Sequence, residues 1–179
     1  NLEIANLLKA GAIFGRCVGR SEFGARSLGN RSILADPRRW KEARRINETI
    51  KSRDFWMPFA PSILDHSAPE YFSDPKGIAP QFMTFAFEAA KGGYEDLVAA
   101  SHPKDKTIRP QVVTKDANPD YHAAIAAYRE RTGRGVILNT SFNLHGEPIV
   151  YGPANALDVL QRSGLRHVAL DDHIISKVE

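Results

Sequence analysis

The sequence lacks features that several common classes of protein require. Its 179 residues include one cysteine, Cys17, so an intrachain disulfide is excluded. We expect Cys17 to be a small buried residue of the apolar run 12–18, with a catalytic thiol as the weaker alternative. No apolar run approaches the roughly 18 residues of a membrane span. The chain begins without Met, inside an apparent helix, and shows no secretory signal. We therefore expect a domain of a longer protein in a reducing cytoplasm.

Familiar catalytic signatures are also missing. The sequence contains no P-loop and no Rossmann glycine motif, so neither common nucleotide-binding loop is present. The six histidines are scattered, and their spacing predicts no metal site. No nucleophile elbow supports a Ser-His-Asp triad.

Arginine is abundant by comparison. The net charge is only +3, but fifteen arginines outnumber nine lysines, and nine of the arginines fall within residues 16–53. Guanidinium groups match the oxygens of phosphate and carboxylate, so this bias favours oriented binding of oxyanions. It also leaves nucleic-acid binding open.

The densest arginine segment is residues 19–32, which holds three arginines, three glycines and Glu22 and has no helical or strand period. Glycine lets the backbone approach a ligand closely, and Glu22 could brace one guanidinium. We interpret the segment as an anion-binding loop. The plain alternative is a solvated loop with surface arginines.

Three further segments carry polar groups that could contact a ligand. Lys51 and Arg53 end a predicted helix, although cations there also gain from the helix dipole. Arg109 interrupts an apolar strand and must face water, a partner or a ligand, unless it is a simple edge-strand residue. Asn139 and the polar residues after it follow a short apolar strand, where ligands commonly bind, although such residues also cap turns.

The pattern of elements predicts one α/β domain with a mixed sheet. The pair Asp36-Pro37 predicts a helix start, and Asn118-Pro119 predicts another. The apolar, two-sided segment 81–88 predicts a central strand. The expected helices are 2–10, 37–51, 119–132 and 153–164; the expected strands are 12–18, 59–64, 81–88, 108–114, 135–138, 167–170 and 173–177; and 92–106 is expected to be a loop or lid.

Taken together, these segments resemble the C-terminal domain of the O-carbamoyltransferases. The family pattern includes Gly-Arg-x-Glu-Phe-Gly-x-Arg-x-Leu-Gly-x-Arg-Ser-Ile, Asp-Pro-Arg and Asn-Thr-Ser-Phe-Asn. Nearly the whole chain is covered. The matching segments, in order, are residues 19–33, 36–38, 46–61, 109–111 and 139–150.

The resemblance implies a YrdC-like fold, a twisted mixed sheet with flanking helices around a basic concave cavity. It implies that the domain takes ATP, with Mg²⁺, and carbamoyl phosphate, and forms carbamoyl adenylate with release of pyrophosphate. A separate N-terminal Kae1-like domain, of the actin-type ATPase fold, would pass the carbamoyl group to a hydroxyl acceptor. Such a domain would be the partner of this one.

The resemblance also assigns residues to roles. It implies that Arg26, Arg31 and Lys51 hold phosphate oxygens during catalysis. Substrate or nucleotide would be bound by Arg20, Glu22, Arg53, Arg109, Asn139, Ser141 and Asn143. Many members have an arginine where this chain has Met57, so one phosphate contact is missing or comes from Arg53.

Two other functions remain open from the residues. One is a module that binds RNA or a nucleotide without turnover, and the other is a purely structural domain. A nucleic-acid binder needs a continuous basic face with interleaved aromatic residues. Because the arginines here lie among glycines and apolar residues, the pattern favours a small closed site.

Overall fold

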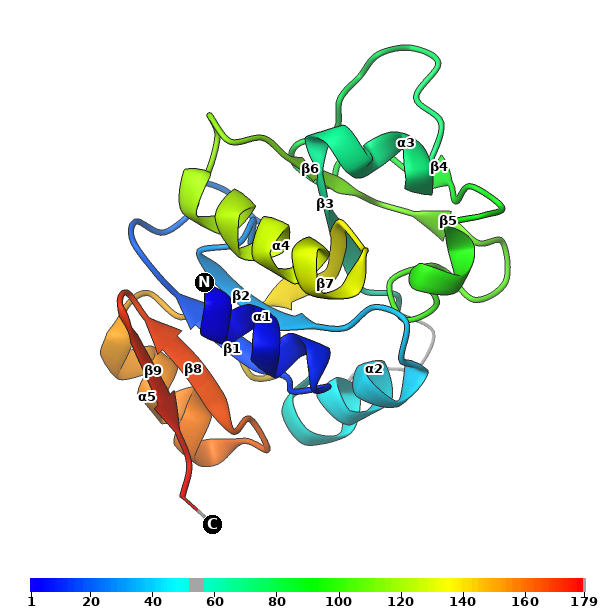
Figure 1. Ribbon diagram of the computed structural model, residues 1–179. Helices are drawn as coiled ribbons and strands as arrows, with labels where there is room; N and C mark the ends of the chain where they lie inside the picture. The colour runs from blue at the N-terminus through cyan, green and yellow to red at the C-terminus, as the bar shows by residue number, and fades with distance from the viewer. Residues whose placement is uncertain (52–56, 179) are drawn as a thin grey trace.

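A computed structural model describes residues 1–51 and 57–178. Its centre is a seven-stranded mixed sheet in the order β6-β3-β7-β2-β1-β8-β9 (Figure 1). The pairs β1–β8 and β3–β6 are parallel, and the other neighbours are antiparallel. The strands are β1 Phe14–Cys17, β2 Arg31–Ala35, β3 Ala60–Leu64, β6 Gln111–Val113, β7 Val136–Ser141, β8 His167–Leu170 and β9 His173–Ser176.

Helices cover both faces of this sheet. Successive residues of a strand point to opposite faces, so Ile33 and Leu34 of β2 enter two different cores. One core packs against α2 and α5, and the other against α1 and α4, which lie side by side in Figure 1. The helices are α1 Leu2–Lys9, α2 Trp40–Ile46, α3 Ala68–Tyr71, α4 Pro119–Thr132 and α5 Pro153–Arg162, with short turns η1 Asn47–Lys51, η2 Asp65–Ser67 and η3 Tyr94–Asp96.

Local signals set the ends of α4 as predicted. The Asn118 side chain accepts a hydrogen bond from the Tyr121 backbone N–H at 3.1 Å, and Pro119 occupies the first turn. Gly133 closes the helix in the left-handed conformation with φ +76°. The expected helices at 2–10 and 153–164 and the expected strands at 12–18, 59–64, 135–138, 167–170 and 173–177 are confirmed to within a few residues.

The predicted helix start at Asp36 is wrong. The helix α2 begins at Trp40, and the buried Asp36 carboxylate instead accepts hydrogen bonds from the backbone and guanidinium of Arg38. A short acidic side chain can bond its own neighbouring backbone in a turn, which here replaces capping. The helix then continues as a short π-helical segment, η1, that ends at Lys51. The strand β2, which includes Arg31, was not predicted.

The predicted central strand at 81–88 is also wrong. Only Phe87–Glu88 is a strand, β4, and it pairs with β5, Thr107–Ile108, in a separate two-stranded sheet. Met83 has φ +55° and is buried, whereas its neighbours Phe82 and Phe85 are exposed, so no strand alternation exists there. The predicted strand 108–114 is divided at Pro110, which has no N–H to donate to a sheet.

Burial settles the environment of Cys17. Its side chain is buried in the core that packs against α2 and α5, and burial raises the pKa of the thiol despite the nearby charge of Arg31. A buried thiol with a raised pKa is not activated for nucleophilic attack. Within the described part of the chain, no helix is both long and apolar enough to cross a bilayer.

Gly29 provides a test of the packing between the arginine-rich loop and α4. It has φ +122°, and a Cβ there would clash with the ring of buried Tyr121. Gly24 has a similar φ of +133° but open space around it. Both Gly→Ala variants incur backbone strain, so the steric clash should make Gly29→Ala less stable than Gly24→Ala by about 1–3 kcal/mol. Urea unfolding of the two variants measures the difference, and equal stabilities would contradict it.

Candidate functional site

A carboxylate organises the arginine-rich loop. The Oε1 atom of Glu22 accepts backbone hydrogen bonds from Leu28 at 2.7 Å, Asn30 at 2.7 Å and Arg31 at 3.3 Å. We expected Glu22 to brace a guanidinium, but within residues 1–51 and 57–178 it forms no ion pair. Its negative charge instead satisfies three amides that point into the loop.

Arg31 closes the same loop from the other side. Its side chain is buried, and its guanidinium donates to four backbone carbonyls, at distances between 2.8 and 3.0 Å. Three of these carbonyls lie at or next to the two ends of the loop, at Val18, Gly19 and Asn30, and the fourth belongs to Tyr151. We expected the Arg31 guanidinium to bind phosphate, but its N–H groups bind backbone carbonyls of the protein instead.

A small polar pocket lies between this loop and the start of β3. Its volume is about 80 Å³. Two guanidiniums line it, Arg26 from the loop and Arg109 from the segment between β5 and β6. The other lining residues are Ala25, Ser27, Pro58, Phe59, Ala60, Met83, Asn139, Thr140 and Ser141.

The two arginines of the pocket are not neutralised. Neither Arg26 nor Arg109 has a hydrogen-bond or ion-pair partner among the described residues. Burial lowers the pKa of Arg109, and the positive charge of Arg26 lowers it further. Two like charges held together at a polar pocket create a site that favours an anion.

A buried network forms the floor of the pocket. The Asn139 Nδ2 atom donates to the Ser27 carbonyl at 3.1 Å and to Ser62 Oγ at 3.0 Å. Ser62 Oγ donates to Gln111 Oε1 at 2.7 Å, and Gln111 Nε2 donates to the Leu28 carbonyl at 2.8 Å. These side chains lie on the adjacent strands β3, β6 and β7, so the sheet fixes the position of the loop that carries Arg26.

Lys51 does not line the pocket but contacts Ser141, which does. Its buried ammonium group donates to Ser141 Oγ at 3.1 Å, to the Asn143 carbonyl at 3.0 Å and to Asn143 Oδ1 at 2.5 Å, and it also contacts the Ser141 carbonyl. Ser141 lines the pocket and donates to Asn143 Oδ1 at 2.7 Å. Lys51 therefore holds the end of β7 in place.

Four of the predicted site residues line one pocket: Arg26, Arg109, Asn139 and Ser141. Lys51 and Asn143 support Ser141, whereas Glu22 and Arg31 build the loop. Arg20 is exposed, and Arg53 lies outside the described residues. Sequence reasoning missed Ser27, Ser62 and Gln111, although a glutamine within an apolar strand could have signalled a buried network.

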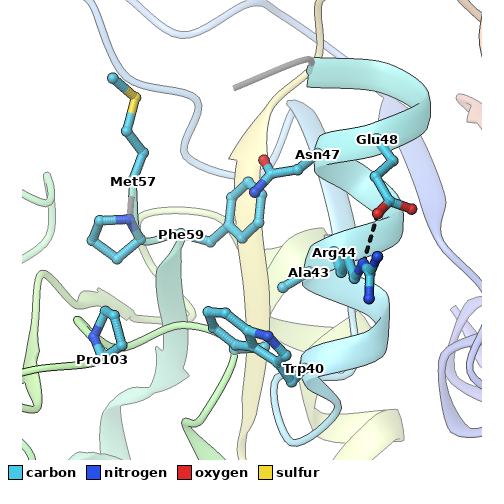
Figure 2. Close-up of a pocket in the computed structure, with 10 residues that line it drawn as sticks. Trp40, Ala43, Arg44, Asn47, Glu48, Met57, Phe59 and Pro103 are labelled. Carbon is cyan, nitrogen blue, oxygen red and sulfur yellow. Dashed lines mark hydrogen bonds and ion pairs between the residues drawn. The ribbon is translucent and has the colours of Figure 1, made fainter. Parts of the chain in front are cut away.

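A second, apolar pocket adjoins the first (Figure 2). It has a volume of about 450 Å³ and shares Pro58 and Phe59 with the arginine pocket. The indole of Trp40 and the side chain of Met57 form two of its walls, and both are 45% exposed. Met57 therefore belongs to the apolar pocket, while Arg109 supplies the second cation of the arginine pocket. At the rim, Arg44 pairs with Glu48 at 2.6 Å.

Comparison with known families shows to which protein family the chain is related. Residues 5–177 match the family described as carbamoyltransferase C-terminus. The chain belongs to this family. It is 40% identical over 174 residues to nodulation protein NolO of Bradyrhizobium diazoefficiens, covering 97% of this chain and 32% of that protein. It is 29% identical over 181 residues to the 3'-hydroxymethylcephem-O-carbamoyltransferase of Amycolatopsis lactamdurans, covering 99% of this chain and 33% of that enzyme. The chain thus spans about a third of the length of these curated relatives of the carbamoyltransferase family.

Solved structures confirm the YrdC-like fold. The crystal structure of full-length HypF in its phosphate- and nucleotide-bound form matches 99% of this carbamoyltransferase-family chain and 22% of HypF, with a TM-score of 0.62 and 15% identity. Escherichia coli YciO matches 99% of this chain and 87% of its own, also with a TM-score of 0.62 and 18% identity. At these identities the comparison establishes the fold alone.

The contacts of Arg31 give a prediction for this family member. Arg31→Ala should lower the free energy of unfolding by about 1.5–3 kcal/mol, because four backbone carbonyls lose a charged donor. Arg20→Ala changes an exposed arginine of the same loop and should stay within about 0.5 kcal/mol of the wild type. Chemical denaturation measures both. If Arg31→Ala were as stable as the wild type but lost phosphate binding, Arg31 would contact ligand directly.

Proposed function

We propose that this domain catalyses the first half of an O-carbamoyl transfer, the formation of carbamoyl adenylate from ATP and carbamoyl phosphate. The observation that carries the proposal is a pair of guanidiniums, Arg26 and Arg109, that have no ion-pair partner within residues 1–51 and 57–178 and lie at a small polar pocket of a carbamoyltransferase-family domain. Both substrates are phosphate esters or anhydrides, whose charge such a pair would balance.

Electrostatics supports an anion as the missing partner of the pocket. The charged forms of Arg26 and Arg109 repel each other, and desolvation adds a further cost at Arg109. A phosphoryl group between them would turn this repulsion into two attractions. The empty pocket therefore lowers the stability of the fold through this repulsion, a pattern that is common where a site binds a charged ligand.

The volumes of the two pockets indicate which part of a nucleotide each one would hold. A cavity of about 80 Å³ suits a single phosphoryl group, whereas the adjoining cavity of about 450 Å³ falls within the usual range for small-molecule sites. Trp40 offers an aromatic face for stacking. We place phosphoryl oxygens between the arginines and the adenine ring beside Trp40, with Pro58 and Phe59 between them.

The proposed reaction needs no covalent nucleophile from the protein. Carbamoyl phosphate reacts with water and releases inorganic phosphate, which leaves carbamate. A carbamate oxygen then bonds to the α-phosphorus of ATP as the bond to the β-phosphate oxygen breaks, and pyrophosphate leaves. The domain would align the reactants and neutralise their oxyanions, with Mg²⁺ arriving on ATP. Ser141 would stay in place at the wall of the pocket, because its hydroxyl donates to Asn143 Oδ1 and accepts from the Lys51 ammonium.

The second half of the transfer would take place outside this chain. The curated relatives are about three times longer than the part matched here. We propose that the remainder, a Kae1-like domain, receives carbamoyl adenylate and passes the carbamoyl group to a hydroxyl acceptor. We also propose that the protein works in the cytoplasm, where ATP is supplied.

The two pocket arginines should affect binding more than folding. Arg26→Ala and Arg109→Met should each weaken binding of ATP and of inorganic phosphate by roughly ten- to a hundredfold, because each removes a charge-assisted contact. The ligand-free variants should be at least as stable as the wild type, because repulsion is removed. Calorimetry and thermal unfolding measure the two effects.

Two control variants sharpen this prediction. Arg129→Ala makes the same change in net charge but removes a partly exposed arginine of α4 that pairs with Glu70 of α3, so binding should not change. Trp40→Ala should weaken ATP binding and leave phosphate binding intact, because only the base lies in the apolar pocket. A loss of affinity in Arg129→Ala equal to that in Arg109→Met would show that overall charge, rather than the pocket, holds the ligand.

Turnover tests the reaction itself. Pyrophosphate should be released from ATP only when carbamoyl phosphate is present, because carbamate is the attacking group. The amount should be near one per site in this chain and should rise when the longer protein supplies an acceptor, since the labile product is then removed. Equal release without carbamoyl phosphate would contradict the mechanism. Binding of ATP without any release would instead favour a nucleotide-binding module.

A further inference from the structure

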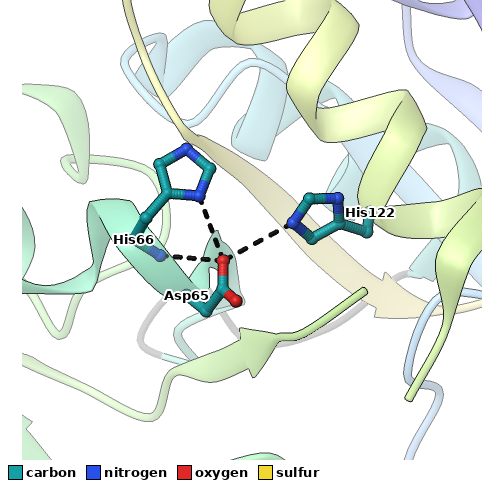
Figure 3. Close-up of side chains that lie close together, drawn as sticks. All are labelled: Asp65, His66 and His122. Atoms are coloured by element: carbon teal, nitrogen blue, oxygen red, sulfur yellow. Dashed lines mark hydrogen bonds and ion pairs between the residues drawn. The ribbon is translucent and has the colours of Figure 1, made fainter. Parts of the chain in front are cut away.

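The consecutive residues Asp65 and His66 meet His122, which is distant in the sequence, at the end of β3 opposite to the one at the arginine pocket. The Oδ1 atom of Asp65 lies 3.1 Å from His66 Nδ1 and 3.5 Å from His122 Nε2. Figure 3 shows both imidazole rings turned toward this carboxylate. One possible ligand atom from each residue lies within 4.8 Å of the other two.

A short turn and a helix carry the three groups. Asp65 and His66 form the η2 turn directly after β3, and His122 lies in the first turns of α4. Ala60, at the opposite end of β3, lines the arginine pocket. The cluster is therefore a separate site, which none of the steps proposed above uses.

The spacing fits a transition metal. For bonds of about 2.0–2.1 Å, the donors of a tetrahedral zinc site lie about 3.3 Å apart. The two separations from Asp65 Oδ1 bracket this value, and the ring centroids of His66 and His122 are 6.1 Å apart, so a small rotation would bring their nitrogens onto one ion. Two imidazoles with one carboxylate suit zinc and its neighbours better than magnesium or calcium.

The carboxylate is already prepared for a cation. Burial alone would raise the pKa of Asp65, but hydrogen bonds from the His66 backbone and from both imidazoles outweigh it and lower the pKa. The histidine side chains are accessible to solvent, at 52% for His66 and 17% for His122, which leaves an entry path for an ion.

We infer that Asp65, His66 and His122 form a binding site for a divalent transition metal of the zinc class. Three protein ligands leave a fourth position open. Asp65 also lines a pocket of about 530 Å³ together with Phe72, Pro80 and Thr114. The open position therefore adjoins a cavity that can admit water or a small anionic ligand. A bound ion would also join the β3–η2 turn to α4.

Direct metal binding tests the site. Titration of the protein with Zn²⁺ against a chromogenic chelator should reveal one tight equivalent, and Co²⁺ should give the visible absorption of a tetrahedral site. His122→Gln should weaken zinc binding at least about tenfold and abolish the Co²⁺ bands. Zinc should raise the melting temperature of the wild type but not of His122→Gln.

A matched control separates this cluster from ordinary surface histidines. His102 lies 3.0 Å from Asp105 in an exposed pair that has no second imidazole, so His102→Gln should bind zinc as the wild type does. Circular dichroism should show that both variants are folded. Equal zinc affinity in the wild type and His122→Gln, or no zinc-dependent rise in melting temperature, would show that Asp65 only bridges two histidines by hydrogen bonds.

Discussion

The Glu22 carboxylate, held among three backbone amides, supports the position of the whole arginine-rich loop. Without it, the N–H groups of Leu28, Asn30 and Arg31 would point at one another with no acceptor. The guanidinium of Arg31 completes the arrangement by gathering the carbonyls on either side of the loop. A loop with no helix or strand of its own thereby becomes fixed enough to hold Arg26 at the pocket.

This division of labour explains why the loop is so rich in arginine. Arg31 is buried and structural, whereas Arg26 is exposed and lines the pocket, with no partner in the part of the chain that the structure describes. Arg109 also lines this pocket. It lies with Pro110 in the short segment between β5 and β6. The repulsion between Arg26 and Arg109 costs stability, whereas the hydrogen bonds of Glu22 and Arg31 stabilise the loop that carries Arg26. Such a site can bind an anion tightly with little rearrangement.

The two ends of β3 carry different chemistry. One end, at Ala60, meets the loop and the strand end that together form the arginine pocket. The other, at Asp65, meets α4 and its histidine. Both sites draw on α4 or the loop packed against it, because Tyr121 lies against Gly29.

The sequence by itself determined the fold class, the family and the ends of α4, because Asn118-Pro119 and Gly133 act on their immediate neighbours. It also identified four polar residues that line the arginine pocket, Arg26, Arg109, Asn139 and Ser141. It could not separate Arg26 from Arg31, since both have the same side chain in the same loop, and only burial distinguishes them. It misassigned 81–88, where hydrophobicity indicated a strand but tertiary packing bent the chain. Only the tertiary structure brought His122 to Asp65, because contacts across 57 positions follow from how α4 packs on the sheet.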